Sequence, residues 1–315
     1  MKRNLSILLV LTFVILSLSG IQPVSLQAAA AYETVDPAFG SRTKAGTLYL
    51  YQEWTSAEKN TRSVYYAKSK SGKGKRIFTT AGESSSTVVV TNGSYIYYIK
   101  DNGTGTKHNI IRYNVSNGKS TTLYSIKTAA DGFAGINHYY GGIIYYTVED
   151  AGKQTLAAFT IKTKASKNLT TGATVEAASG RYLYLLKKNG SHAIYDLKGS
   201  KTVKTFAGEK DGFALQFIQL QENISTVYAV YQKSDWEYFN EEYIQNTTVR
   251  VYSYKLNGSG EQLVFEETGY GLSVYRMTSL SVYYKAVMDE TNYYYRYSLN
   301  YKKTAVVSEA AFLGY

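Results

Sequence analysis

Short apolar segments rich in tyrosine alternate with polar turns along most of the chain. Aromatic and branched residues at this density favour pleated strands. No long window shows an apolar stripe of helical period, so we expect few helices. The six most regular segments are GTLYLYQEW from Gly46, SYIYYIKDNG from Ser94, GIIYYTVED from Gly142, RYLYLLKKNG from Arg181, STVYAVYQK from Ser225 and SVYYKAVMDE from Ser281.

These segments recur about every 45 residues, the length of one four-stranded propeller blade. We take as equivalent Tyr49, Tyr97, Tyr145, Tyr184, Tyr228 and Tyr283. The best-formed repeat predicts strands at 86–91, 95–100, 108–115 and 120–124, with Asn-Gly turns at 92–93 and 117–118. The same frame predicts first strands at Phe133–Tyr140, Ala173–Ala178, Phe213–Gln221 and Leu272–Thr278.

The repeat predicts an all-β fold, a six-bladed β-propeller of four-stranded antiparallel blades. The first repeat lacks a first strand before Gly46, and the segment 310–315 is left over at the C-terminus. We therefore expect this C-terminal strand to join the first blade and close the ring, which removes open edges. Tyr32–Phe39 is the alternative for that place, and the uneven spacing leaves a seventh, N-terminal blade open.

The first thirty residues have the layout of a secretory signal peptide. A basic start, Met1–Asn4, precedes an apolar run from Ile7 to Leu18 and small residues at 28–31. We divide the chain into a signal peptide at 1–30, an N-terminal lead-in at 31–45 and a single β-propeller domain at 46–315. An uncleaved anchor is the alternative, although the run is shorter than the ~20 residues that span a bilayer.

The absence of cysteine excludes disulfides, thiolate metal sites, a lipoprotein anchor and cysteine nucleophiles. With the leader peptide, it indicates a secreted, extracellular or cell-wall-associated protein of a Gram-positive bacterium. We expect no integral membrane segment after cleavage of the signal peptide.

Two strand pairs carry a family resemblance, IYYIKDNG with IIRYNVSNGK, and LYLLKKNG with AIYDLKGSK. They resemble the repeats of YWTD and TolB-type six-bladed β-propellers, and most closely the tyrosine-rich, uncharacterised relatives in secreted bacterial proteins. The likeness covers residues 45–315 and implies a propeller fold. Trp and Thr-Asp are absent at the matching positions, so no ligand-binding residue is carried over.

The residues that catalysis or metal binding needs are sparse. His108, His138 and His192 have no metal-ligand spacing, and no nucleophile, phosphate-loop or dinucleotide motif occurs. We expect no catalytic residues, no metal and no cofactor, and interpret His138 as a structural histidine. The alternative is an extracellular carbohydrate-active hydrolase or lyase that uses loop carboxylates. Its candidates are Glu149–Asp150, Asp235 with Glu237, Glu241–Glu242 and Asp289–Glu290, while the first strands offer only Glu176.

The formal charge of +11 is distributed unevenly in the predicted blades. Turns between third and fourth strands carry a proposed basic face, comprising Lys73, Lys75, Arg76, Lys164, Lys167, Lys198, Lys201, Lys302 and Lys303. Loops at the opposite end carry most of the acidic residues. A basic face on a secreted protein suits an anionic cell-wall polymer or phospholipid head groups rather than nucleic acid. Alternatively, these lysines serve solubility alone.

Aromatic residues in the acidic loops are candidates for recognition. Trp54 lies in the first of these loops, and the longest, SDWEYFNEEYIQN from Ser234, brings further aromatic residues. The candidate ligand-binding residues are Trp54, Trp236, Tyr238, Phe239, Asp131 and Asp211. We expect a secreted, non-enzymatic binding protein whose partner is an extracellular glycan, an anionic cell-wall polymer or a protein. Two alternatives are that the loop packs onto its own blade, and that the chain is a structural domain of an assembly.

Overall fold

The computed structural model describes residues 32–56, 58, 61–80, 86–221, 226–239, 242–278, 280–288 and 291–313. The predicted signal peptide lies outside these residues. Within them the chain is almost entirely β-structure, and its strands form six sheets in chain order. Each sheet is an antiparallel meander of four consecutive strands, which we call a blade, and two of the blades carry one extra strand.

The strands of each blade follow one another from the inner to the outer side of the molecule. Blade 1 consists of β2 (Thr43–Ala45), β3 (Leu48–Ser56), β4 (Thr61–Ala67) and β5 (Lys75–Thr79). Blade 2 consists of β6 (Val89–Thr91), β7 (Tyr95–Asp101), β8 (Lys107–Asn114) and β9 (Ser120–Lys127), with β1 (Glu33–Val35) added beside β6. Blade 3 consists of β10 (Phe133–Tyr140), β11 (Ile143–Asp150), β12 (Lys153–Thr160) and β13 (Ala165–Thr171).

The second half repeats this order. Blade 4 consists of β14 (Ala173–Ser179), β15 (Tyr182–Lys187), β16 (His192–Asp196) and β17 (Lys201–Phe206). Blade 5 consists of β19 (Phe213–Gln221), β20 (Thr226–Phe239), β21 (Glu242–Lys255) and β22 (Gln262–Tyr270), with β18 (Glu209–Lys210) beside β19. Blade 6 consists of β23 (Ser273–Met277), β24 (Ser281–Met288), β25 (Thr291–Ser298) and β26 (Lys303–Val306), followed by helix α2 (Glu309–Leu313).

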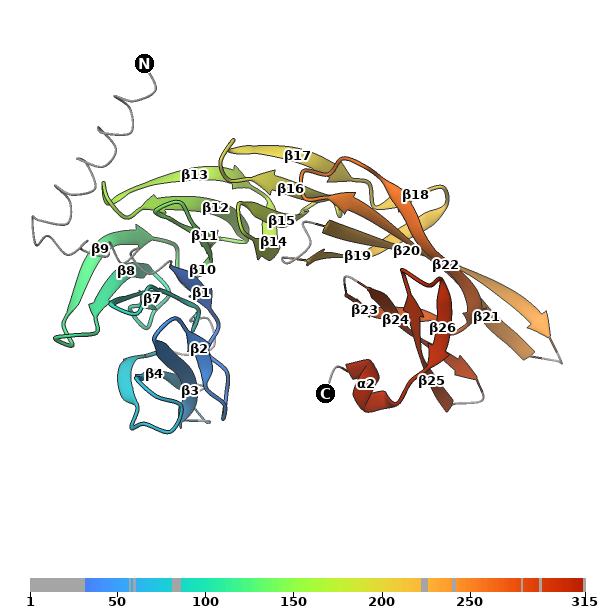
Figure 1. The fold of residues 1–315 in the computed structure, drawn as a ribbon. Coiled ribbons are helices and arrows are strands. Elements are labelled where there is room, and N and C mark those ends of the chain that lie inside the picture. Colours follow the sequence, from blue (N-terminus) through green and yellow to red (C-terminus); the bar gives the residue numbers. More distant parts are fainter. Residues whose placement is uncertain are drawn as a thin grey trace, which may run out of the picture.

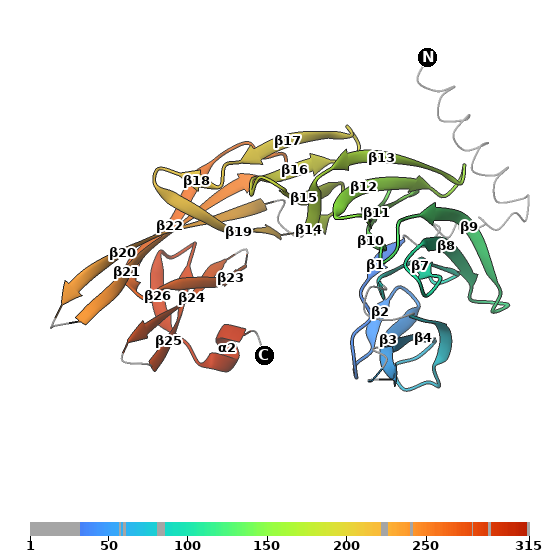
Figure 2. The ribbon, with the colours of Figure 1, turned by 180° about the vertical axis from the view of Figure 1, so that it is seen from behind.

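The predicted all-β class and the four-stranded antiparallel blades are confirmed. The first strands predicted at Phe133–Tyr140 and Phe213–Gln221 coincide with β10 and β19. The blades stand side by side along an open arc whose two ends do not meet (Figure 1), and the view from behind shows the same opening (Figure 2). The molecule is therefore a propeller-type repeat whose ring is open.

The predicted closure by a C-terminal strand is wrong. The described part of this tail forms the helix α2, which packs on its own blade: Phe312 is buried between the rings of Tyr275 and Tyr294. Arg276 holds the helix by donating hydrogen bonds to two of its carbonyl oxygens. Blade 1 obtains its inner strand from β2 instead. The alternative segment Tyr32–Phe39 is divided between two blades: β1 pairs with β6 of blade 2, and Phe39 forms a bridge with Gln52 in β3 of blade 1.

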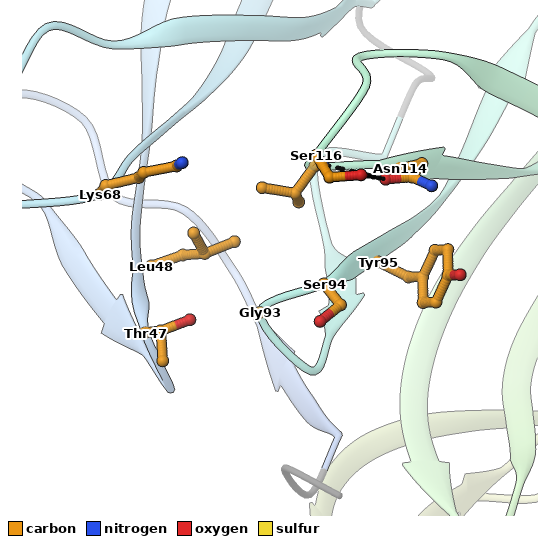
Figure 3. Close-up of a pocket in the computed structure, with 9 residues that line it drawn as sticks. Thr47, Leu48, Lys68, Gly93, Ser94, Tyr95, Asn114 and Ser116 are labelled. Carbon is orange, nitrogen blue, oxygen red and sulfur yellow. Dashed lines mark hydrogen bonds between the residues drawn. The ribbon is translucent and has the colours of Figure 1, made fainter.

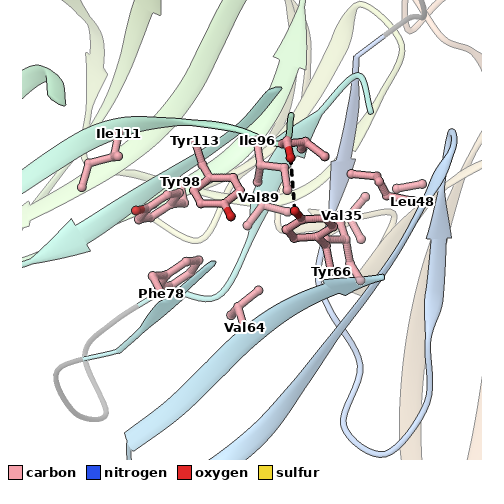
Figure 4. Close-up of a cluster of buried hydrophobic side chains, with 13 residues drawn as sticks. Val35, Leu48, Val64, Tyr66, Phe78, Val89, Ile96, Tyr98, Ile111 and Tyr113 are labelled. Atoms are coloured by element: carbon pink, nitrogen blue, oxygen red, sulfur yellow. Dashed lines mark hydrogen bonds between the residues drawn. The ribbon is translucent and has the colours of Figure 1, made fainter. Parts of the chain in front are cut away.

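Among the described residues, the hydrophobic core consists of five clusters, one between each pair of neighbouring blades. Successive side chains of a strand point to opposite faces of its sheet. In β7, Ile96 and Tyr98 therefore pack toward blade 1, and Tyr97 and Ile99 toward blade 3. Figure 4 shows the first cluster, in which Phe78 and Tyr98 stack with ring centroids 4.3 Å apart.

One predicted equivalence is wrong by one residue. The ladder pairs Lys44 with Tyr49 and Tyr139 with Ile144, so Tyr49 occupies the position of Ile144 rather than that of Tyr145. Leu50, fully buried, takes the tyrosine position in blade 1. The prediction aligned the repeats on their tyrosines, whereas blade 1 has a leucine at the position of Tyr145.

The outer strands share a second repeated device. In each of the first five blades the ladder between the third and fourth strands slips by one residue, which leaves one outer-strand residue unpaired. Such bulges bend a strand and increase its twist. Every unpaired residue is aliphatic, half-buried and packed against the adjoining cluster: Ile77, Leu123, Leu169, Val203 and Val264.

We expect the fold to fail at alkaline pH because its core holds neutral tyrosines. Burial raises the pKa of Tyr145, Tyr146 and Tyr231 to about 12, and that of Tyr97 and Tyr184 further still. In the unfolded chain a tyrosine ionises near its ordinary value of 10.0. The stabilisation is therefore complete below pH 10 and is lost progressively as the pH rises from 10 to about 12 and above.

Circular dichroism and phenolate absorbance, recorded together through an alkaline titration, test this expectation. The buried tyrosines should ionise only as the sheet signal disappears. Complete phenolate formation with an intact sheet signal would contradict it.

We also expect α2 to stabilise blade 6 alone. Replacing Phe312 with Ala removes a buried ring, a change that costs about 3 kcal/mol in well-packed sites. Hydrogen exchange should then accelerate in β23 and β25 and stay unchanged in β2 and β3. Leu313→Ala, at a more exposed neighbouring position, is the matched control. Equal acceleration in blade 1 would show that the tail reaches the first blade after all.

Candidate functional site

The blades share two ends, which differ in chemistry. At the turn end lie the connections between first and second strands and between third and fourth strands. There His138 Nε2 lies 2.8 Å from the carbonyl oxygen of Gly180 in the next blade. At the opposite end, the loop end, Asp150 accepts a 2.6 Å hydrogen bond from the backbone N–H of Ala129 in the preceding blade. These contacts place equivalent ends of neighbouring blades side by side.

All nine residues of the predicted basic face are exposed and lie in or beside the turns between third and fourth strands. They belong to blades 1, 3, 4 and 6: Lys73, Lys75, Arg76, Lys164, Lys167, Lys198, Lys201, Lys302 and Lys303. Among the residues that the structure describes, none of the nine forms an ion pair within 4.0 Å. We call this set the basic edge. Its charges are free to attract an anion.

The turn from Ala67 to Arg76 in blade 1 is the most densely basic part of this end. It reads AKSKSGKGKR and contains no acidic residue. Arg42 fixes the turn, because its guanidinium donates to the carbonyl oxygens of Ser69 and Gly72 and lies 4.7 Å above the ring of Tyr51. A Cβ at Gly74 would collide with the Tyr51 hydroxyl, so the backbone passes directly against this ring.

The predicted long aromatic loop is instead a hairpin. Strands β20 and β21 pair without a register break from Thr226–Lys255 to Phe239–Glu242. They extend beyond the rest of blade 5 as an arm (Figure 1). We call the outer part, 234–246, the aromatic arm. The acidic and polar residues of this segment predicted a loop, although the strand-like alternation of polar and aromatic residues continues through it.

The arm has two chemically distinct faces. Trp236 and Tyr238 point to one face and are 66% and 65% exposed. Lys233 and Asp235 point to the other and form a 3.1 Å ion pair. By register the aromatic face continues the side on which Val249 is buried in the cluster shared with blade 6. Phe239 ends β20, and its side chain lies outside the described residues.

Trp54 is not brought near the aromatic arm. It lies near the end of β3 in blade 1, 53% exposed, and stacks on Phe39 with centroids 5.0 Å apart. Blades 1 and 5 stand in opposite limbs of the arc (Figure 1). The two tryptophans therefore belong to separate surfaces.

Asp131 and Asp211 occupy corners that lead into inner strands. Both are exposed and have left-handed backbones, with φ of 60° and 53°. Aspartate tolerates this conformation better than most residues. Asp211 and Gly212 form the two-residue turn between β18 and β19, where two positive φ angles suit a tight hairpin. A turn-forming role thus accounts for these residues, and a ligand-binding role remains a prediction.

Several loop carboxylates hold the loop end together. Glu149 and Asp150 are neighbours on β11, so their side chains leave opposite faces of the sheet. Asp150 caps Ala129, and Glu149 accepts from Gln154, which in turn accepts from the Thr174 hydroxyl of blade 4. The carboxylates of Glu237, Glu241, Glu242, Asp289 and Glu290 lie outside the described side chains.

A buried histidine links two loops of blade 2. His108 is 1% exposed, and its Nδ1 lies 3.2 Å from Asp101 Oδ2. Its Nε2 lies 3.2 Å from the hydroxyl of Thr128, which donates to the carbonyl oxygen of Gly105. The network connects the loop between β7 and β8 to the corner before β10. His108 and Asp101 therefore have a structural role, which the sequence did not predict for this pair.

The inner strands present a group of residues of which the sequence analysis singled out only Glu176. The ladders of β10, β14, β19 and β23 each skip one residue near mid-strand, respectively Asn137, Glu176, Gln216 and Tyr275. These strands line the concave side of the arc (Figure 1). Glu176 acts electrostatically on the hydrogen-bonded pair Tyr184 and His192, and burial lowers the pKa of His192. No sequence motif marks these positions, because they arise from slips in strand pairing.

Among the described residues, no group of three or more His, Asp or Glu side chains is arranged to hold a metal ion. The described helix is too short to cross a membrane.

No protein-family model and no curated protein matches this chain. Solved structures resemble it at low identity. TolB from Acinetobacter baumannii is 13% identical with a TM-score of 0.37, over 79% of this chain and 60% of TolB. The uncharacterized protein lmo1340 from Listeria monocytogenes EGD-e is 10% identical with a TM-score of 0.45, over 89% of this chain and 83% of that one. The β-propeller domain of Cps50 (Swd1) from Myceliophteria thermophila is 9% identical with a TM-score of 0.40, over 89% and 90%. This likeness concerns the fold alone.

We expect the His108 network to stabilise the loop end. His108→Ala removes the histidine partner of the buried Asp101 carboxylate, which should lower the free energy of unfolding by about 2 to 3 kcal/mol. His138→Ala, which removes an exposed hydrogen bond to Gly180, is the matched control and should change it by less than about 1 kcal/mol. Urea denaturation measures both variants. Equal midpoints would contradict a structural role for the His108 network.

Proposed function

We propose that this chain is a secreted, non-enzymatic binding protein. It recognises an extracellular partner with the aromatic arm, and it is held at the cell surface by the basic edge. The leader-like residues 1–30 and the absence of cysteine support secretion from a Gram-positive bacterium.

The observation that carries this proposal is the exposure of Trp236 and Tyr238 on one face of the arm. Large aromatic side chains contribute more binding energy per residue than most others, and adjacent exposed ones mark interaction surfaces. Their spacing of two along a paired strand places both rings on the same side. A partner therefore meets a preformed aromatic strip and need not order a loop.

The basic edge adds attraction of a different kind. Exposed lysines act over roughly 8 Å at physiological ionic strength, so they raise the local concentration of anionic polymers without fixing a geometry. Attachment of this kind weakens as salt rises, whereas stacking on the arm persists. The two surfaces thus divide attachment from recognition.

A second candidate function rests on Glu176. Glu176 is an exposed residue of the inner strand β14, and its charge acts on the Tyr184–His192 pair. A carbohydrate-active hydrolase or lyase would need such an acid. Release of reducing sugar from a polysaccharide, abolished by Glu176→Gln, would favour this enzyme over the binding protein.

Cell-wall binding tests the aromatic arm. We expect Trp236→Ala combined with Tyr238→Ala to weaken binding to purified Gram-positive cell walls at high salt at least about tenfold, with the fold unchanged. Co-sedimentation measures the bound fraction, and melting temperature reports the fold. Tyr301→Ala, which removes a 79% exposed aromatic ring from blade 6, is the matched control. Equal binding by the double variant and this control would refute a role for the arm.

A further inference from the structure

A pocket of about 360 Å³ opens between blades 1 and 2 at the turn end. Thr47 and Lys68 of blade 1 face Ser94, Asn114 and Ser116 of blade 2 across it (Figure 3). Lys68 belongs to the densely basic turn described above. The pocket therefore lies beside the basic edge, and a cation and several hydroxyl groups line the same cavity.

The lining combines three chemical functions. Thr47, Ser94 and Ser116 supply hydroxyls that donate or accept, and Asn114 supplies an amide. Leu48, almost fully buried, provides an apolar floor. Such a mixture suits a small polyol or sugar, whose hydroxyls need partners and whose C–H groups need an apolar surface.

Lys68 gives the pocket its charge. Its side chain is exposed and, in the part of the chain described, pairs with no carboxylate within 4.0 Å. In Figure 3 its amino group extends toward Ser116 and Asn114. A lysine in this position binds a phosphate as a point charge.

The pocket is held open by contacts of its walls. Asn114 accepts hydrogen bonds from the backbone and the hydroxyl of Ser116, at 2.9 and 2.7 Å, and the Val115 N–H donates to Ser94 at 3.0 Å. The hydroxyl of Tyr66 in blade 1 donates to the Val115 carbonyl oxygen at 3.3 Å. These bonds fix the blade 2 wall before a ligand arrives, which reduces the entropy lost on binding.

Gly93 lets the two blades meet at the mouth of the pocket. Its backbone has φ of 83°, and a Cβ there would collide with the hydroxyl of Thr47. Glycine is required on both counts, since a side chain would be strained and would displace Thr47.

We propose that this pocket binds one polyol phosphate unit of an anionic extracellular polymer. Lys68 pairs with the phosphate, and the hydroxyls of Thr47, Ser94 and Ser116 bind those of the polyol. The inference rests on the proposed attachment through the basic edge and adds to it a stereochemical site. Phosphate polymers that carry a polyol are thereby distinguished from other polyanions.

Titration of the full mature chain with poly(glycerol phosphate) and with polyglutamate of similar length, at low and high salt, tests the proposal. Lys68→Gln removes the charge, and Ser94→Leu fills the cavity without changing charge. Lys302→Gln removes another exposed charge, in the basic edge of blade 6, and is the matched control. Unchanged melting temperatures establish that the variants are folded.

We expect Lys68→Gln and Ser94→Leu to weaken poly(glycerol phosphate) binding about tenfold, and Lys302→Gln about twofold. Polyglutamate binding should respond alike to both lysine variants and should ignore Ser94→Leu. If poly(glycerol phosphate) follows that same pattern, the pocket is overturned while charge-based attachment stands. If neither polymer binds even at low salt, the attachment through the basic edge fails as well.

Vesicles of phosphatidylglycerol in phosphatidylcholine distinguish the source of the same chemistry. The polymer assignment predicts that Ser94→Leu leaves vesicle binding unchanged. A loss of vesicle binding in this variant, with polymer binding retained, would overturn the polymer as the ligand.

Discussion

The side chains of the second strand in each blade point alternately to the two neighbouring blades, and the rest of the structure depends on this shared burial. In β15, Leu183 and Leu185 pack toward blade 3 and Tyr184 toward blade 5. Each such side chain contributes about 1.5 to 3 kcal/mol when it is withdrawn from water. An isolated blade would expose both faces, so the blades are stable only as neighbours.

The same dependence explains the character of the two end blades, each of which has one neighbour. Tyr49 on blade 1 and Tyr283 on blade 6 point to the faces that no blade covers, and both are only half-buried. Arg276 lies 3.8 Å above the ring of Tyr283, and its donors hold α2. Strand β26 is exposed along its whole length. The open end is thus protected by a cation over a ring and by one short helix rather than by a further sheet.

Much of the fold could be predicted from the sequence because blade packing repeats with the chain. The tyrosine and aliphatic alternation predicted the strands, and glycine turns marked the ends of β6 and β8. The structure of the C-terminal tail could not be predicted in this way. The sequence of 310–315 resembles that of an inner strand, but Phe312 of helix α2 packs against Tyr275 and Tyr294. Three-dimensional contacts, not local pattern, decided between strand and helix.

The candidate sites were predictable to different degrees for the same reason. Lysines in turns are exposed wherever blades repeat, so the basic edge could be read from the sequence. The pocket beside Lys68 could not, because Thr47 and Ser116 come from different blades and meet only through packing. The mid-strand slips in strand pairing at Asn137 and Glu176 could not be predicted either, because no residue type marks such a slip.

The aromatic arm is a direct continuation of two strands of blade 5. Strands β20 and β21 keep one register along their whole length, so the side of the sheet that buries Val249 is also the side that carries Trp236 and Tyr238. Near the root that side faces blade 6. Farther out the same face meets solvent, where Trp236 and Tyr238 are 66% and 65% exposed. The apolar face of the arm extends beyond blade 6, which covers the same face near the root. Exposed apolar surface of this kind marks an interaction site, and this is the physical basis for expecting a partner there.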